Sequence, residues 1–273
     1  MLPPDYGAIV VNSVSKWYPG NRRKDSPLQA LDDVSMTLSR GDLGILLGAS
    51  GCGKSTLLRM VAGLENIDQG DIRVSGKPVV APGRDRGMVF QSYTSFPWLT
   101  VEQNVAYGLK INADRSSERE GAVGYYLEQV GLSQFRNSYP EQLSGGMKQR
   151  VAIARALANQ PAVLLMDEPF GALDPETRNN MQELLLGIAR RERMTVLMVT
   201  HDVEEALFLG DAITFLSSRP GRVKEYIVPD FGSDKDTRNK SAFKALPAFA
   251  EMDDRIRHMM REESDRSHET LSL

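Results

Sequence analysis

The sequence predicts an α/β fold with a mostly parallel core sheet, a small antiparallel β subdomain and an inserted helical subdomain. Short apolar runs with the character of buried strands occur at residues 43–47, 162–166 and 195–200. A helical pattern from about residue 174 to 193 separates the last two runs, and strands that alternate with helices form parallel sheets. From residue 101 to 158 the apolar spacing is mostly helical, which predicts that a helical lobe interrupts the core.

The first strands of the chain predict the antiparallel subdomain. Residues 8–14 and the alternation of Val34, Met36 and Leu38 predict half-buried strands, and a polar loop with Pro and Gly separates them. The run at 43–47 then stops at Gly48, and helical spacing follows as far as Gly63. The chain therefore passes from a strand through a glycine loop into a helix.

The remaining elements follow the same patterns. We expect short strands at 72–74 and 87–90, and a hairpin of residues 212–217 and 223–228 around a Pro-Gly turn. A final helix would carry four apolar side chains on one face: Phe249, Met252, Ile256 and Met259. The last ten or so residues are expected to fray.

The composition predicts a chain without a membrane span of its own. The longest apolar runs are far shorter than the roughly 20 residues that cross a bilayer, so any membrane association must go through a partner. The chain of 273 residues has 33 Lys and Arg against 36 Asp and Glu, and this net charge of -3 disfavours broad nucleic-acid binding. Its single cysteine, Cys52, excludes an internal disulfide, and the start lacks a signal-peptide pattern, so we expect a cytosolic location.

The glycine loop matches a phosphate-binding motif. Residues 48–55 satisfy G-x-x-x-x-G-K-[ST], in which backbone N–H groups turn inward on phosphate oxygens at a helix N-terminus. Lys54 is expected to reach the β- and γ-phosphates, Ser55 to ligate Mg²⁺, and Thr56 to bind further back on the phosphate chain. The expected nucleotide-binding residues of this loop are Gly48, Ala49, Ser50, Gly51, Cys52, Gly53, Lys54, Ser55 and Thr56. For Cys52 a small loop filler is favoured, with a reactive thiol as the alternative.

Two adjacent carboxylates follow the apolar run at 162–166. Asp167 and Glu168 should point to opposite sides, as neighbours in a strand do, and so should have different roles. Asp167 is placed to hold the Mg²⁺ shell, whereas Glu168 can orient and polarise the attacking water as a general base. Taken alone, Asp-Glu-Pro is equally well explained as the start of a helix. Beside a phosphate-binding loop, the catalytic interpretation is preferred.

A third motif relates the chain to a known family. The stretch LSGGMKQR at residues 143–150 resembles the signature motif of ABC ATPases, the nucleotide-binding subunits of ATP-binding-cassette transporters. Ser144, Gly145 and Gly146 lie at a predicted helix N-terminus and can form a second phosphate cradle, although the serine also serves as an ordinary N-cap. The resemblance implies a P-loop NTPase (RecA-like) core that binds ATP. It also implies a homodimer in which the Ser144 loop of one subunit closes on the ATP held by Lys54 of the other.

The resemblance extends to single residues outside these motifs. Tyr18 resembles the aromatic residue that stacks on adenine in this family, Gln91 the glutamine that contacts Mg²⁺ and water, and His201 the switch histidine that contacts the γ-phosphate. Residues 173–174 resemble the loop that crosses between subunits. The implied catalytic residues are Glu168, His201 and Gln91, and the implied Mg²⁺ ligands are Ser55, Gln91 and Asp167.

The resemblance covers nearly the whole chain and implies a single ABC ATPase domain at residues 1–240. Its ATP-binding core would comprise about 1–95 and 159–230, and its helical subdomain about 96–158. Residues 241–273 would form the C-terminal helix and the frayed tail.

Two segments bear on partners and on the branch of the family. Residues 92–99 include aromatic side chains, and the family implies that this surface receives a coupling helix from a membrane permease. Alternatively, Phe96 and Trp98 pack the joint between the two lobes. The short length and residues 217–222 look like the nitrate/sulfonate/taurine-type importer ATPases, in which a binding protein and the permease select the solute.

The resemblance therefore implies an ATP-hydrolysing subunit at the cytoplasmic face of the inner (plasma) membrane, bound peripherally to permease subunits. Closure of the ATP-bound dimer would drive uptake of a small anionic solute such as nitrate, a sulfonate or taurine. A soluble ABC-type regulator not coupled to transport is the alternative, but such relatives usually carry tandem cassettes or a long coiled-coil insertion. The intact Glu168 disfavours a module that binds ATP and hydrolyses little.

Overall fold

Two sheets organise the computed structural model, which describes residues 8–20, 27–92, 94–112, 116–231 and 240–271. The larger sheet has six strands in the order β10-β9-β3-β8-β7-β6, and β10 runs antiparallel to β9 while the other neighbours are parallel. Its strands are β3 (Leu43–Gly48), β6 (Arg86–Val89), β7 (Val163–Asp167), β8 (Thr195–Thr200), β9 (Ala212–Leu216) and β10 (Val223–Ile227). The mostly parallel core sheet and the closing hairpin are confirmed.

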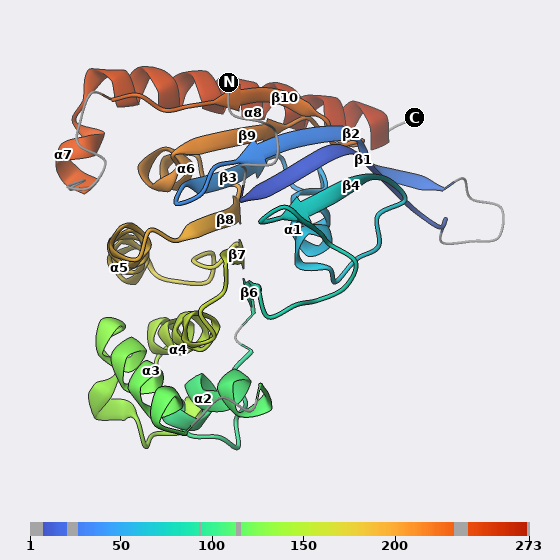
Figure 1. The fold of residues 1–273 in the computed structure, drawn as a ribbon. Coiled ribbons are helices and arrows are strands. Elements are labelled where there is room, and N and C mark those ends of the chain that lie inside the picture. Colours follow the sequence, from blue (N-terminus) through green and yellow to red (C-terminus); the bar gives the residue numbers. More distant parts are fainter. Residues whose placement is uncertain (1–7, 21–26, 93, 113–115, 232–239, 272–273) are drawn as a thin grey trace.

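Helices surround this sheet (Figure 1). They are α1 (Lys54–Ala62), α2 (Val101–Ile111), α3 (Ser116–Gln129), α4 (Gly145–Ala158), α5 (Pro175–Arg191), α6 (Val203–Leu209), α7 (Lys240–Lys244) and α8 (Pro247–Leu271), with short 3-10 turns at Ser133–Phe135 and Pro140–Gln142. Strands β3, β7, β8 and β9 are buried along their whole length, which explains their continuous apolar runs. Ile45 packs in the core beneath α4, α5, α6 and α8, whereas Leu46 packs with α1 and the antiparallel sheet.

The smaller sheet is antiparallel, as predicted. Its order is β2-β1-β4-β5. The strands are β1 (Ile9–Tyr18), β2 (Leu28–Leu38), β4 (Gln69–Val74) and β5 (Lys77–Pro78). Strand β5 was not predicted because two exposed residues carry no alternating pattern. This sheet covers α1 and brings Tyr18, at the end of β1, beside the glycine loop.

The predicted helical lobe is present between β6 and β7. Helices α2, α3 and α4 gather at the end of the molecule that lies away from the antiparallel sheet (Figure 1). Helix α2 begins at a capping box in which Thr100 and Gln103 satisfy each other's backbone N–H groups. Helix α4 contacts both α2 in the lobe and β6 in the core, so it joins the two parts.

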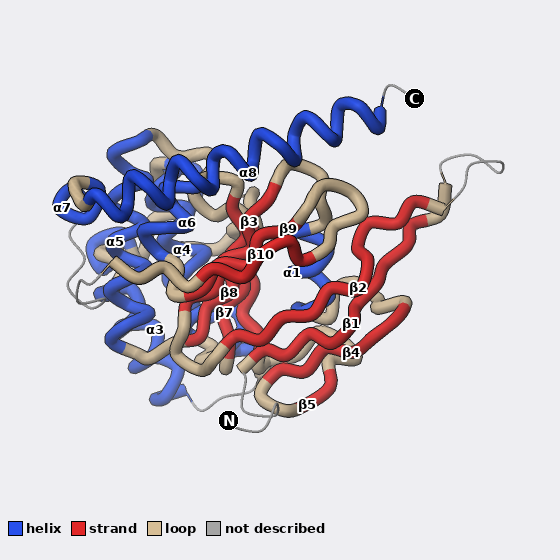
Figure 2. Tube along the Cα trace, turned by 90° about the horizontal axis from the view of Figure 1, so that it is seen from above, coloured by secondary structure: helices blue, strands red, loops and turns tan. Residues whose placement is uncertain are grey.

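The C-terminal helix α8 differs from the expected frayed tail. The helix lies along α6 (Figure 2). On one of its faces Phe249 and Ile256 are buried and Met252 and Met259 are partly buried, as predicted. Its backbone stays helical to Leu271. The buried side chain of Glu263 bonds Ser218 in the loop after β9 and Lys224 on β10. Residues 272–273 lie outside the described residues. Within the part of the chain that the structure describes, no helix has the length and hydropathy that a membrane span needs.

Candidate nucleotide-binding site

The glycine loop lies between β3 and α1, as expected. Gly53 has a φ of 102°, and a Cβ atom there would lie 2.5 Å from Leu31 Cδ2, so both the backbone and the available space require glycine. Lys54 opens α1 and is 5% exposed. Its ammonium group donates hydrogen bonds to Gly48 O at 2.7 Å and to Ala49 O at 2.9 Å. The lysine is therefore already folded back over the loop that would receive phosphate.

An alcohol and a carboxylate meet at the start of α1. Ser55 Oγ donates to Asp167 Oδ1 at 2.7 Å, and Asp167 is buried at the end of β7. Mg²⁺ prefers oxygen ligands and usually combines one or two carboxylates with substrate phosphates and water. These two side chains fit that ion. Among the described residues, no cluster of three or more His, Cys, Asp or Glu side chains provides a metal cage made by protein alone.

The second carboxylate of the pair faces different partners. Glu168 Oε2 lies 3.3 Å from Gln91 Nε2 and 3.2 Å from His201 Nδ1. These residues follow β6, β7 and β8, which are neighbours in the sheet, so three strand ends bring them together. Glu168 also has a φ of 43°, a left-handed conformation that is uncommon for a residue with a side chain and that recurs at functional sites. Asp167 and Glu168 thus have separate surroundings, as their neighbouring positions predict.

A pocket of about 260 Å³ opens over the glycine loop. The predicted site residues that line it are Tyr18, Ser50, Gly51, Gly53, Lys54, Ser55, Thr56 and Glu168. Leu28, Ala30 and Arg219 line it as well and were not predicted. Leu28 and Ala30 look like ordinary strand residues, and Arg219 lies in a segment whose pattern indicated a turn and a family branch. No local signal in the sequence marks these three as part of a pocket.

The aromatic ring of Tyr18 packs against the ammonium group of Lys16. Lys16 Nζ lies 5.3 Å from the ring centroid, a cation–π geometry. The same ammonium group is held 3.1 Å from Glu65 Oε1 and 3.4 Å from Asp68 Oδ1, and these partners raise the pKa of Lys16 although burial alone would lower it. The Tyr18 hydroxyl lies 3.4 Å from Thr56 Oγ1. The ring is therefore fixed at the rim of the pocket.

The signature residues lie elsewhere. Ser144 is exposed and caps α4, its Oγ accepting a hydrogen bond from Met147 N at 3.3 Å. The described lining of the pocket over the glycine loop, and that of a cavity of about 60 Å³ beside His201, contain neither Ser144, Gly145 nor Gly146. Within one chain, the two predicted phosphate-binding elements therefore do not meet.

Cys52 is enclosed by the glycine loop. Its side chain is 1% exposed, and burial raises the pKa of the thiol although the nearby Lys54 ammonium lowers it. Since the thiolate is the reactive form, these surroundings favour the interpretation of Cys52 as a small filler.

A groove of about 600 Å³ lies between the core and the helical lobe. Phe96 lines it, and its ring centroid lies 4.4 Å from that of Tyr107 and 5.6 Å from that of Trp98. Arg155 Cζ also lies over the Phe96 ring, at 5.5 Å from the ring centroid. Phe96 therefore packs the joint between the lobes, as the alternative interpretation proposed, whereas Trp98 is 70% exposed.

Together, the fold and this site define a class of protein. A glycine loop between a buried parallel strand and a helix, with carboxylates at the end of a nearby strand, makes the chain a P-loop nucleoside triphosphatase. The family model described as ABC transporter matches residues 31–171, and the chain belongs to that family. It is an ATP-binding cassette that hydrolyses ATP.

Relatives and solved structures agree with this assignment. The chain is 46% identical to the nitrate import ATP-binding protein NrtD of Synechocystis, over 93% of this chain and 95% of that protein. It is 46% identical to the taurine import ATP-binding protein TauB of Chromobacterium violaceum, over 82% of this chain and 84% of that protein. Among solved structures, the dimeric ATP-binding cassette MJ0796 bound to ADP and Pi matches with a TM-score of 0.70 and 32% identity, over 81% of this chain and 98% of that one. These structures confirm the predicted fold class.

Proposed function

We propose that this chain is the ATP-hydrolysing subunit of an importer for a small anionic solute, such as nitrate or a sulfonate. The observation that carries the proposal is the cluster of Glu168, Gln91 and His201 beside the phosphate pocket, in a chain whose relatives are named for nitrate and taurine import. A cluster of this kind suits hydrolysis, and the names of the relatives support its use in uptake.

In this proposal, ATP binds with its phosphates on the loop at 48–56 and its adenine on Tyr18. Ser55, Gln91 and Asp167 would hold Mg²⁺, which would neutralise negative charge on the phosphates. Glu168 orients water and accepts its proton as the oxygen attacks the γ-phosphorus. The bond from that phosphorus to the β–γ bridging oxygen breaks, giving ADP and phosphate, while His201 contacts the γ-phosphate.

The Ser144 loop completes the site from a second copy of the chain. Its helix N-terminus presents Ser144 and the backbone N–H groups of Gly145 and Gly146, which suits phosphate binding, but it lies apart from the pocket of its own chain. The dimeric state of the similar cassette MJ0796 supports this pairing. Because ATP would contact both loops, its binding favours the closed dimer and its hydrolysis favours opening.

The groove between the lobes is the proposed docking surface for the permease. It combines apolar side chains such as Phe90 with the cations Arg84 and Arg155, and Trp98 lies exposed beside it. An amphipathic segment with apolar and acidic side chains fits such a lining. The chain would then sit at the cytoplasmic face of the inner membrane as a peripheral subunit, while the permease and its binding protein select the solute.

The experiment that tests this function is affinity purification of the tagged chain from membranes of its native host, beside a Trp98→Glu variant. We expect an integral membrane permease to co-purify with the wild-type chain and to be lost with the variant, which places a charge on the docking surface. A control, Tyr139→Glu, changes an exposed aromatic residue outside the groove lining and should retain the permease. Recovery of soluble factors alone would instead favour the regulator.

A further inference from the structure

The loop that joins β9 to β10 packs directly on the glycine loop. Gly221 N donates to Ala30 O at 2.9 Å, and a Cβ atom at Gly221 would lie 2.0 Å from Cys52 O. Where the glycine loop begins, a Cβ atom at Gly48 would lie 2.7 Å from the carbonyl oxygen of Leu216 at the end of β9. With backbones in such close contact, the two loops cannot move independently.

Arg219 extends from this joining loop to the nucleotide pocket. Its Nη2 donates to Gly51 O at 3.3 Å, and its side chain lines the same pocket as Lys54, Ser55 and Thr56. A guanidinium group carries five N–H donors and matches phosphate oxygens well. Arg219 therefore adds a second cationic side chain to a wall that would otherwise depend on Lys54.

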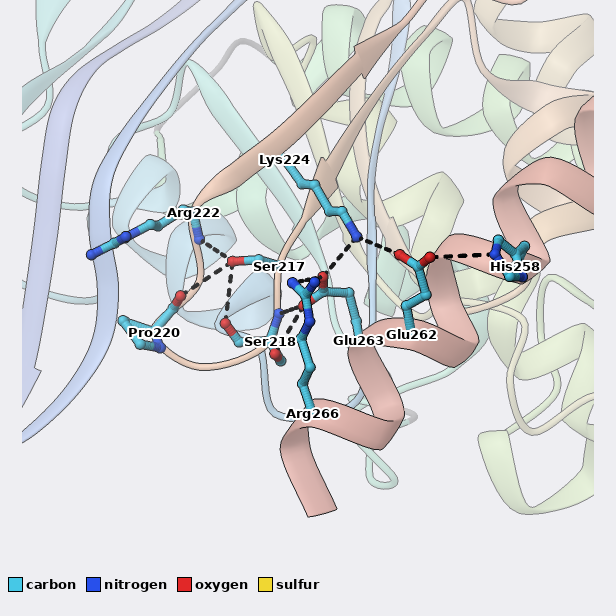
Figure 3. Close-up of polar contacts among 9 residues, drawn as sticks. All are labelled: Ser217, Ser218, Pro220, Arg222, Lys224, His258, Glu262, Glu263 and Arg266. Atoms are coloured by element: carbon cyan, nitrogen blue, oxygen red, sulfur yellow. Dashed lines mark hydrogen bonds and ion pairs between the residues drawn. The ribbon is translucent and has the colours of Figure 1, made fainter. Parts of the chain in front are cut away.

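The joining loop is closed on itself, so that Arg219 stands at its tip. Ser217 Oγ accepts a hydrogen bond from Arg222 N at 3.1 Å and donates to Pro220 O at 3.3 Å (Figure 3). The Ser217 N–H also donates to Arg222 O at 2.9 Å. These bonds fix the shape of the loop but do not by themselves attach it to the rest of the molecule.

Besides the bonds of Gly221 and Arg222 to β2, a second attachment comes from the C-terminal helix. Glu263 on α8 accepts hydrogen bonds from Ser218 N at 2.6 Å and Ser218 Oγ at 2.9 Å, from Lys224 Nζ at 2.8 Å and from Arg266 Nη1 at 3.2 Å (Figure 3). The Glu263 side chain is 1% exposed. Burial alone would raise the pKa of Glu263, but the hydrogen bonds from Lys224 and Ser218 outweigh it and lower the pKa. The ionised carboxylate of Glu263 thus holds Ser218, the residue that directly precedes Arg219, through two hydrogen bonds.

We propose that Arg219 is a further nucleotide-binding residue that contacts the phosphate oxygens of ATP, and that Glu263 is the positioning residue that holds its loop from the C-terminal helix. The proposal deepens the proposed function, since it concerns the same ATP site, and it gives α8 a role in nucleotide affinity. The chain of contacts runs from Glu263 through Ser218 to Arg219 and Gly51.

The first test measures ATP affinity of the full chain by titration calorimetry. Arg219→Met keeps the aliphatic stem and removes the charge, and we expect about tenfold weaker binding, because a charge-assisted phosphate contact is lost. Arg219→Lys should recover part of the loss. Arg222→Ala is the control on the same loop: Arg222 bonds Asp32 on β2 and is absent from the described pocket lining, so affinity should stay at the wild-type value. Wild-type affinity in Arg219→Met would overturn the nucleotide contact.

The second test asks whether Glu263 acts through Arg219. Glu263→Gln should raise the KM for ATP about threefold to tenfold and leave kcat within about twofold, since it weakens ground-state and transition-state binding alike. Combined with Arg219→Met, it should cause no further loss of ATP affinity. Additive losses in the double variant would contradict the positioning role.

Two further variants separate positioning from general stability. Glu262→Gln changes the neighbouring residue, which also reaches Lys224 at 3.1 Å but is exposed, and should leave the KM for ATP unchanged. Ser218→Ala removes a single hydrogen bond to Glu263 and should act in the same direction as Glu263→Gln with a smaller effect, which keeps the test valid if Glu263→Gln folds poorly. An unchanged KM in both Ser218→Ala and Glu263→Gln would overturn the role of α8.

These tests also separate this inference from the importer function. All affinities are measured on the chain without its permease, and Lys54→Ala serves as the reference for loss of phosphate binding. If Arg219→Met leaves ATP affinity unchanged while Lys54→Ala lowers it about a hundredfold and the permease still co-purifies, the inference fails alone. If the permease never co-purifies but the Arg219 and Glu263 effects hold, the importer function fails alone.

Discussion

The two phosphate-binding elements of this chain differ in how much of their surroundings the chain itself provides. The loop at 48–56 lies in a pocket with a buried lysine, a nearby carboxylate pair and an aromatic rim. The Ser144 loop is an exposed helix N-terminus whose only described hydrogen bond at the serine side chain is local. In the proposed function, the first element binds ATP within one chain, whereas the second has a phosphate to bind only when another copy supplies it. The following predictions test that difference.

The largest effect is expected at Glu168. Glu168→Gln keeps the contacts with Gln91 and His201 sterically possible but removes the proton acceptor, so hydrolysis should fall about a thousandfold while ATP binding persists. The ATP-bound dimer should accumulate and elute as a dimer in size-exclusion chromatography. Glu183→Gln, at an exposed position on α5, is the control and should hydrolyse ATP normally. Normal turnover in Glu168→Gln would remove Glu168 from the catalytic role.

A smaller effect is expected at Lys54. Lys54→Ala removes the buried ammonium group over the loop, so ATP affinity of the monomer should fall about a hundredfold. The control, Lys110→Ala, removes an exposed lysine on α2 and should bind ATP as the wild-type chain does. Titration calorimetry compares the ATP affinities of the two variants. Equal affinities would contradict the assignment of the loop at 48–56 as the phosphate-binding loop.

Ser144 should separate binding from closure. Ser144→Glu places a negative charge where a second copy would present its ATP phosphates, so dimer formation and hydrolysis should fall about tenfold or more through like-charge repulsion. Binding of ATP to the monomer should stay unchanged, because the Ser144 loop lies outside the pocket of its own chain. Ser133→Glu, an exposed serine in the same lobe, is the control. A loss of monomer affinity in Ser144→Glu would show that the two elements are not independent.

The smallest effect concerns Cys52, which reports on the enclosure of the glycine loop. Because burial raises its pKa, the thiol stays protonated at neutral pH and should react with a disulfide reagent at least about tenfold more slowly than a free thiol. As Cys52 is the single cysteine, the coloured thiol that the reagent releases reports the reaction of this residue alone. Unfolding in urea should restore the fast rate. Rapid reaction in the folded chain would revive the interpretation as a reactive thiol.

Features that depend on residues close together in the sequence could be predicted, whereas contacts between distant residues could not. The glycine loop is contiguous, and its flanking strand and helix have their own periodic patterns, so its place in the fold was foreseen. Different surroundings for Asp167 and Glu168 were expected from strand alternation, but Glu168 lies just beyond β7 with a left-handed φ of 43°, which no sequence pattern indicated. The contact between Glu263 on α8 and Ser218 was not foreseen, because it joins residues 45 apart in the sequence.

By itself, the sequence determined the strand-loop-helix unit, the signature loop and the family to which the chain belongs, since each depends on neighbouring residues. Only the tertiary structure decided which distant side chains surround the pocket. Arg219 and Gly51 are 168 residues apart, and their contact exists because β9 lies beside β3 in the sheet. The separation of the Ser144 loop from the pocket also emerged only in the folded chain, because the inserted lobe sets where that loop stands. Local patterns carry information about local hydrogen bonding, whereas a pocket wall results from packing between segments that carry no such pattern.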